Sequence, residues 1–387
     1  MWRHIASNGL SFLIIACIAF AGAVGWSQHR YSEDGPLEQA IFFEVRPGAS
    51  MRVVSNALSE QGAVSSAMLF RLGADYAGRA GDLRFGNYEI PAGASMEDVL
   101  DIVTAGGPSI FRYTATYVLS NQGSGELRLR ERVPGTGEVI NLASFGPEDA
   151  VPSAYSDLRN AGTPIVYRVS VPEGLTSWQI IEGLREAEFL SGDVEALPLE
   201  GTLAPDTYEV ARGTAIPELL AGMEAAQLAN LTAAWAGRAD GLPLENAQEA
   251  LILASIIEKE TSVPDERRQV ASVFVNRLNR GMRLQTDPTV IYGVTDGRGV
   301  LGRGLRQSEL RGETPWNTYV IDGLPPTPIA NPGRAAIEAA VNPDDTDYVF
   351  FVADGTGGHA FAQTLDEHNS NVSRWRQIEA EREAVSE

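Results

Sequence analysis

A charge-free apolar run near the N-terminus is the feature that most constrains this chain. Residues 5–28 contain no Asp, Glu, Lys or Arg, and residues 10–26 (LSFLIIACIAFAGAVGW) are almost wholly apolar. A helix rises about 1.5 Å per residue, so this run can cross a hydrocarbon core about 30 Å thick. Trp2 and Trp26 stand where interfacial anchors occur. We therefore predict a single-pass transmembrane helix over residues 9–27, after a cytoplasmic tail (1–8) and before a linker (28–40).

Two other interpretations of this run stay open. Residues 21–23 (AGA) fit the A-x-A pattern of a signal-peptide cleavage site. Cys17 follows a short apolar stretch, as in lipoproteins, although the apolar run continues past it. Arg3 and Arg30 flank the run on opposite sides, so the positive-inside rule does not decide the orientation.

Charge and cysteine content exclude several classes of function. The 387 residues, enough for two or three domains, include 30 Lys and Arg against 51 Asp and Glu, and the formal net charge is -21. Such a balance opposes a broad phosphate-binding surface, so we predict no nucleic-acid partner. One cysteine and four histidines leave little for His/Cys ligation of a metal. We predict neither a metal nor another cofactor.

A short pattern of strand, Pro/Gly turn, Ser or Thr, and helix recurs three times after the linker. Strands are predicted at 41–45, 86–90 and 165–171, and each leads into a helix whose N-cap is Ser50, Ser95 or Thr176. We predict an α+β chain with small modules at 41–107 and 165–215. Between them, residues 108–164 alternate apolar and polar side chains with Gly-rich breaks, which predicts a β-rich insertion or spacer.

The last part of the chain, 216–387, is where chemistry is expected. Helices are predicted from 216 to about 235, from 246 to 261 and from 270 to 278, with loop and strand after Gly281. The second helix ends in EKET, where Glu258 and Glu260 lie about 200° apart around the axis. Glu260 lies over Ile256 and Ile257, an apolar environment that would raise the pKa of its carboxyl toward the range of a general acid. The alternative is a solvated helix end.

Three further stretches could form the walls of a site. Residues 282–293 (MRLQTDPTVIYG) place amide, hydroxyl, carboxylate and phenol groups on a strand-like segment, which suits a polyhydroxylated ligand. Residues 324–333 carry four prolines and predict a rigid loop, either a groove wall or a structural crossover. Residues 354–361 (DGTGGHAF) predict a hairpin turn that aims His359. A Ser-His-Asp hydrolase is disfavoured because no G-x-S-x-G motif is present.

These stretches resemble one known family. The runs ASIIEKET (254–261), VASVFVNRL (270–278), MRLQTDPTVIYG (282–293), ETPWNTY (313–319), GLPPTPIANPG (323–333), FVADGTGGHAF (351–361) and EHN (367–369) are similar to the endolytic murein transglycosylases of bacteria. Upstream, APDTYEV (204–210) matches the PDTY run of that family, and the strand-turn-helix modules resemble its LysM-like region. The stretch 108–164 departs from the compact pattern of the family.

The resemblance implies an inner-membrane protein with a periplasmic catalytic domain. Its substrate would be nascent peptidoglycan strands, which it cuts internally to end glycan elongation, and peptidoglycan synthases (penicillin-binding proteins) would be its partners. Glu260 maps to the catalytic glutamate of the family. The motifs suggest substrate contacts by Glu258, Asn276, Gln285, Thr286, Asp287, Tyr292, Asn317 and His359.

Two other functions stay open beside this one. A plain muramidase would use Glu260 as the acid and Asp287 as nucleophile or base. A noncatalytic glycan-binding scaffold would use neither carboxyl for chemistry.

Overall fold

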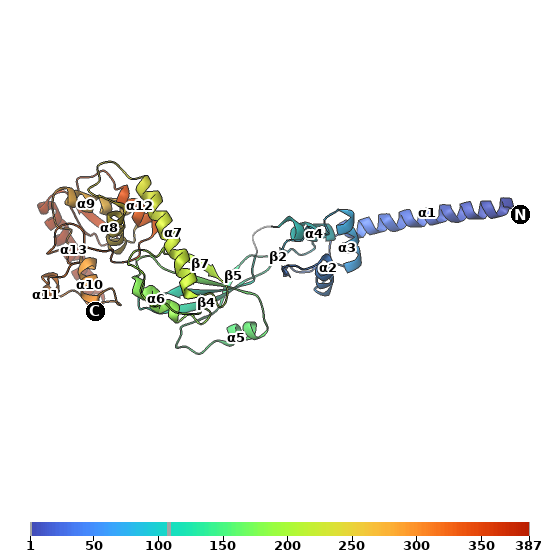
Figure 1. Cartoon of the computed structure of the whole chain (residues 1–387), viewed down its shortest axis with the longest axis horizontal. Coiled ribbons are helices and arrows are strands. Elements are labelled where there is room, and N and C mark those ends of the chain that lie inside the picture. Colours follow the sequence, from blue (N-terminus) through green and yellow to red (C-terminus); the bar gives the residue numbers. More distant parts are fainter. Residues whose placement is uncertain (1, 107–109, 387) are drawn as a thin grey trace. The chain divides into compact units, whose positions relative to one another are not determined.

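The computed structural model describes residues 2–106 and 110–386 and has a mixed α+β fold, as predicted (Figure 1). The boundary predicted between residues 107 and 108 lies outside the described residues. Contacts divide the chain into two compact units. The first comprises residues up to Thr114 with Leu129–Ala143 and Ser153–Val166, and the second comprises Ala115–Arg128, Ser144–Pro152 and Tyr167 onward.

The chain begins with the long helix α1 (Trp2–Ser32). Within it, Phe12–Ser32 is long and apolar enough to cross a membrane, and no side chain of its most apolar stretch is buried inside the protein. Near its end, Tyr31 packs against the core of the first unit. This helix is consistent with the predicted single-pass anchor and extends to Ser32, beyond residue 27.

The first unit contains the first two strand-turn-helix patterns, which pair with each other. Strand β1 (Ile41–Val45) runs antiparallel to β2 (Gly86–Ile90), so that Ile41 lies opposite Ile90. The helices are α2 (Met51–Glu60), α3 (Ala67–Tyr76) and α4 (Met96–Ala105). Ser50 and Ser95 cap α2 and α4 through their hydroxyls, as predicted. The apolar faces of these elements form one core that includes Phe43, Leu58 and Phe70.

The middle of the chain is rich in strands, as the alternating pattern predicted. Strands β3 (Tyr113–Leu119), β4 (Gly125–Arg132), β5 (Val139–Phe145), β6 (Ile165–Ser170) and β7 (Thr207–Val210) form one sheet in the order β5-β4-β3-β6-β7. The short helix α5 (Ser153–Asn160) precedes β6. The third predicted pattern is confirmed, because Thr176 caps α6 (Ser177–Arg185) after β6.

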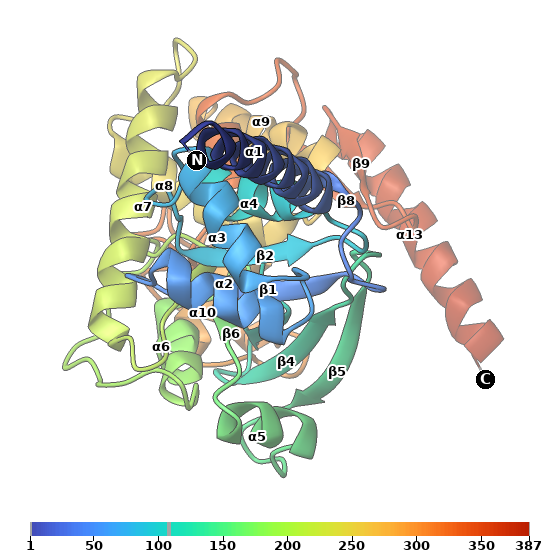
Figure 2. The ribbon, with the colours of Figure 1, turned by 90° about the vertical axis from the view of Figure 1, so that its right-hand side faces the viewer.

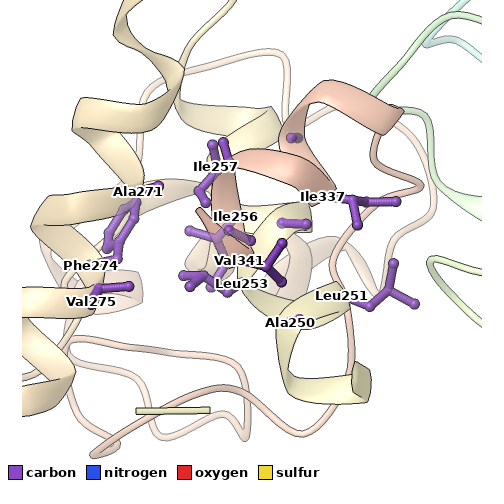
Figure 3. Packing of buried hydrophobic residues seen from close by; sticks show 14 of the residues in the cluster. Ala250, Leu251, Leu253, Ile256, Ile257, Ala271, Phe274, Val275, Ile337 and Val341 are labelled. Carbon is purple, nitrogen blue, oxygen red and sulfur yellow. The ribbon is translucent and has the colours of Figure 1, made fainter. Parts of the chain in front are cut away.

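A helical core supports the C-terminal part. It contains α7 (Ile216–Ala236), α8 (Ala247–Glu260), the 3-10 turn η1 (Pro264–Glu266), α9 (Arg267–Asn279) and α12 (Arg334–Val341). Every residue of α8 from Ala250 to Ile257 is buried, since α9 and α12 pack against it (Figure 3). A helix that is apolar on all sides belongs in the centre of a core. The three helices predicted from 216 to 278 are confirmed within a few residues.

Two predictions for the region after Gly281 are wrong. Residues 282–293 are not strand-like, because α10 (Asp287–Thr295) begins at Asp287 with Pro288 in its first turn. Proline fits there because the first helical N–H groups need no intrahelical partner, and burial of Thr289 and Val290 outweighs their preference for strands. The region also contains α11 (Gln307–Leu310), α12 and α13 (Leu365–Ser386), so it is not only loop and strand.

The predicted hairpin and proline-rich loop are confirmed. Strands β8 (Phe350–Ala353) and β9 (His359–Ala362) pair antiparallel, with Ala353 opposite His359. Helix α13 follows and packs on both strands (Figure 2). Residues 324–333 contain no helix or strand.

Candidate active site

Glu260 is the last residue of α8, where the buried helix reaches the edge of the core. Asn246 starts this helix, and its side-chain oxygen accepts the Glu249 N–H at 3.0 Å. Since Ile256 and Ile257 are fully buried, the core fixes the direction in which Glu260 leaves the helix.

The environment of Glu260 favours its protonated form. Burial raises the pKa of the Glu260 carboxyl, and the nearby Asp287 carboxylate adds to this rise. The Thr286 hydroxyl donates a hydrogen bond to Glu260 Oε1. This bond, His359 and Arg277 all lower the pKa, but burial is the largest effect. The net direction is upward, as a general acid requires.

Two hollows meet at Glu260. One, of about 280 Å³, is lined by Ser262, His359 and Trp375, together with the β8–β9 turn. The other, of about 350 Å³, is lined by Arg277, Gln285, Asp287 and Tyr319 among others. Glu260 lines both hollows. The Glu260 carboxyl can therefore be reached from both hollows.

Buried threonine hydroxyls hold the segment that faces Glu260. The Thr286 N–H donates to Thr318 Oγ1 at 3.0 Å, and the Thr289 and Thr318 hydroxyls share a hydrogen bond of 2.8 Å. Thr289 also donates to the Thr286 carbonyl at 2.7 Å. Just before this segment, Gln285 has a φ of 51°, a left-handed conformation that is rare without glycine and clusters at functional sites.

Asp287 and Arg277 complete the second hollow. The Tyr319 hydroxyl donates to Asp287 Oδ1 at 2.7 Å, and burial raises the pKa of Tyr319. Arg277 is buried and donates to the carbonyls of Val349 at 2.6 Å and Leu284 at 2.7 Å. The guanidinium therefore ties α9 to two walls of the hollow.

His359 lies on the other side of Glu260 and is paired with a carboxylate. Its Nδ1 lies 2.8 Å from Glu266 Oε2, and Glu266 is the last residue of η1. The hairpin turn places the imidazole in the lining of the first hollow, beside Glu260.

Four of the residues predicted to bind substrate bond elsewhere. Asn276 donates to the Thr346 and Tyr348 carbonyls, and Asn317 donates to the carbonyls of Glu309, Leu310 and Gly312. Glu258 accepts the Gly333 N–H at 2.9 Å on another face of α8. Tyr292 donates to Glu200 at 3.2 Å. Gln285, Thr286, Asp287 and His359 are brought together around Glu260.

Sequence reasoning missed two carboxyls, Glu200 and Glu266. Glu200 accepts hydrogen bonds from residues 23, 92 and 131 positions away, and Glu266 bonds a residue 93 positions away. These partners lie too far apart in the sequence for a local motif to reveal that they bond to Glu200 or Glu266. Among the described residues, no group of three or more His, Cys, Asp or Glu side chains is arranged to hold a metal ion.

Fold and site together define an α+β protein with one partly buried carboxyl of raised pKa between two polar hollows. A model of the YceG-like family matches residues 144–374, and the chain belongs to this family. The match begins within the stretch 108–164.

Relatives of known name cover the chain to different extents. An endolytic murein transglycosylase of Streptococcus pneumoniae is 26% identical over 96% of this chain, and the chain spans 65% of its length. One from Bacillus subtilis is 42% identical over 34% of this chain and 35% of its own length. A crystal structure of a YceG-like protein from Listeria monocytogenes aligns with 86% of this chain and 99% of its own, at 24% identity and a TM-score of 0.44.

Proposed function

We propose that this protein is an endolytic peptidoglycan lytic transglycosylase. It would cleave the β-1,4 bond between N-acetylmuramic acid and N-acetylglucosamine and leave a 1,6-anhydro end. The observation that carries this proposal is Glu260, a partly buried carboxyl of raised pKa that lines two polar hollows. Membership of the YceG-like family and the names of two relatives support it.

One carboxyl is enough for this reaction. Protonated Glu260 donates its proton to the bridging oxygen, and the bond from this oxygen to the muramyl C1 breaks. The Glu260 carboxylate then takes the proton of the C6 hydroxyl of the same muramyl residue while O6 bonds to C1. The carboxyl is restored, and no water is consumed. Burial raises the pKa of Glu260, which keeps the acid form available for the first step.

Asp287 favours a second candidate function, a hydrolytic muramidase. Its side chain lines the same hollow as Glu260, and a hydrolase requires a second carboxylate roughly 5 to 9.5 Å from the acid. In that case Asp287 would act as nucleophile or base, and water would add to C1. A noncatalytic glycan-binding scaffold would give neither product.

Product analysis separates these functions. The full chain in detergent is incubated with uncrosslinked glycan strands in heavy-oxygen water, and the reducing ends are analysed by mass spectrometry. The transglycosylase gives ends one water lighter than lysozyme products, without heavy oxygen. Reducing sugars that carry heavy oxygen would establish the muramidase, and uncut strands would establish the scaffold.

The two glutamates of the EKET run provide a matched pair of variants. Glu260→Gln keeps the shape of the side chain but removes the transferable proton, so turnover should fall by about 10²–10⁴-fold. Glu258→Gln alters a carboxyl that bonds Gly333 on another face of α8, so it should cost far less turnover. Melting temperatures of both variants exclude unfolding as the cause. A folded, active Glu260→Gln protein would assign the acid to another residue.

Localisation and domain roles form part of the same proposal. The helix α1 would anchor the protein in the inner membrane, with residues 216–387 as the periplasmic catalytic domain and 41–107 and 165–215 as LysM-like modules. The chain would end glycan elongation beside peptidoglycan synthases. An alkaline phosphatase fused to the C-terminus should be active, whereas a fluorescent C-terminal GFP fusion with an inactive phosphatase would reverse the orientation.

A further inference from the structure

Glu266 holds both the backbone and the side chain of His359. Its Oε1 accepts the His359 backbone N–H at 2.9 Å, and its Oε2 lies 2.8 Å from His359 Nδ1. Both side chains are mostly buried, with 16% of His359 and 18% of Glu266 exposed. A carboxylate therefore fixes where the β8–β9 turn ends and how the imidazole ring is oriented.

The close approach of Glu266 depends on a glycine. A Cβ added at Gly358 would lie 2.3 Å from Glu266 Oε1, closer than real Cβ contacts allow. The His359 ring also makes a T-shaped contact with the Phe351 ring, with the ring centroids 5.3 Å apart. The ring has no freedom to turn while these contacts persist.

This orientation of the His359 ring leaves its second nitrogen, Nε2, available to a ligand. A carboxylate only accepts hydrogen bonds, so the contact places a proton on Nδ1. In the neutral ring Nε2 is then an acceptor, and it points away from Glu266. Within the part of the chain that the structure describes, no residue bonds Nε2. His359 lines the hollow that also contains Glu260.

We propose that Glu266 is a positioning residue for His359, and that His359 Nε2 forms a hydrogen bond with a sugar hydroxyl of the glycan strand bound beside Glu260. This inference rests on the proposed function and names one contact that the substrate makes there. No bond forms or breaks at His359. Glu266 acts only through the imidazole that it orients.

Two substitutions of His359 distinguish substrate contact from a structural role. The amide of glutamine in His359→Gln reaches about as far as Nε2, whereas that of His359→Asn reaches about as far as Nδ1 and can still contact Glu266. If Nε2 binds substrate, His359→Asn should lose about ten- to a hundredfold in kcat/KM, and His359→Gln should retain several-fold more. If the ring only supports the turn, the order reverses, and that result would overturn the proposal.

Glu266 is tested in combination with His359. Glu266→Ala should lose about as much kcat/KM as His359→Asn, but it should cost almost nothing more when added to His359→Asn, because the two act as a unit. Independent, additive losses would contradict the positioning role. Glu338→Gln, which breaks an exposed ion pair with Arg334 on α12, is the matched control and should keep full activity. Melting temperatures are measured for every variant.

A measurement of glycan binding tests this inference independently of the proposed function. In the Glu260→Gln background, uncrosslinked glycan should bind about tenfold more weakly when His359→Asn is added and less weakly when His359→Gln is added. Equal binding by all three proteins would overturn the contact. A wild-type protein that binds but does not cut refutes the transglycosylase alone.

Discussion

Glu200 is a partly buried carboxyl that should make stability depend on pH. Its Oε1 accepts the Ser177 N–H at 2.8 Å and the Asn331 amide at 3.2 Å, and Oε2 accepts the Tyr292 hydroxyl at 3.2 Å. These bonds favour the charged form, but burial outweighs them and raises the pKa of Glu200 to about 7. We consider the substitution Glu200→Gln, which keeps the shape and cannot ionise.

The size of the effect follows from the two pKa values. A rise from 4.5 to about 7, at about 1.4 kcal/mol for each unit of pKa, corresponds to about 3 kcal/mol. The native state binds this proton more tightly than the unfolded state does. The stabilisation is therefore complete below pH 4.5 and is lost as the pH rises to about 7. In Glu200→Gln this loss of stability with rising pH is absent, because glutamine cannot ionise. The new amide N–H can donate to the Tyr292 hydroxyl oxygen, so the hydrogen bond between the two side chains is kept.

Urea unfolding at pH 4.5 and at pH 8 measures the prediction. Relative to wild type, Glu200→Gln should gain about 3 kcal/mol in the free energy of unfolding between the lower and the higher pH. Other titrating groups, including Glu258 and Glu260, are present in both proteins and cancel in the difference. Glu224→Gln, at an exposed position on α7, is the control and should show no such change. A difference for Glu200→Gln that is the same at both pH values would refute the reasoning.

Three further substitutions follow from the same contacts. Gly358→Ala places a methyl group against Glu266 Oε1, so kcat/KM should fall about tenfold or more, and wild-type kinetics would contradict it. Thr286→Val removes the hydrogen bond that lowers the pKa of Glu260, so the alkaline limb of the kcat–pH profile should move to higher pH. Asn317→Ala removes a fully buried amide that donates to three partly buried carbonyls and accepts the Tyr319 N–H, which should cost about 1–3 kcal/mol in urea unfolding.

Features set by local sequence could be predicted. Helix α8 has an N-cap at Asn246 and a continuous apolar sequence, and both lie within the helix itself. The burial of Ile256 and Ile257, in the turn before Glu260, follows from the same apolar sequence. The Gly-rich turn before His359 identifies a hairpin by the same kind of local reasoning, because glycine permits its tight backbone.

Features that depend on residues far apart in the chain could not be predicted from the sequence. The β-branched and aromatic run after Asp287 favours a strand by propensity, and only its packing against the core makes it helical. Glu266 lies two residues after Pro264 in a polar turn, and nothing near it in the sequence indicates a bond to His359. The raised pKa of Glu200 likewise results from burial by segments far apart in the chain.

The motifs that resemble the family contain two kinds of polar residue, which differ in whether their hydrogen-bonding atoms are already used within the protein. Asn276, Asn317 and Arg277 give their donors to backbone carbonyls of neighbouring loops, so a substrate would have to compete with these bonds. Such residues build the walls of the site. His359 has one nitrogen held by Glu266 and the other directed away from it. A polar residue that faces the hollow with unused capacity is the better choice for a ligand contact, and this criterion selects His359 over Asn276 and Asn317.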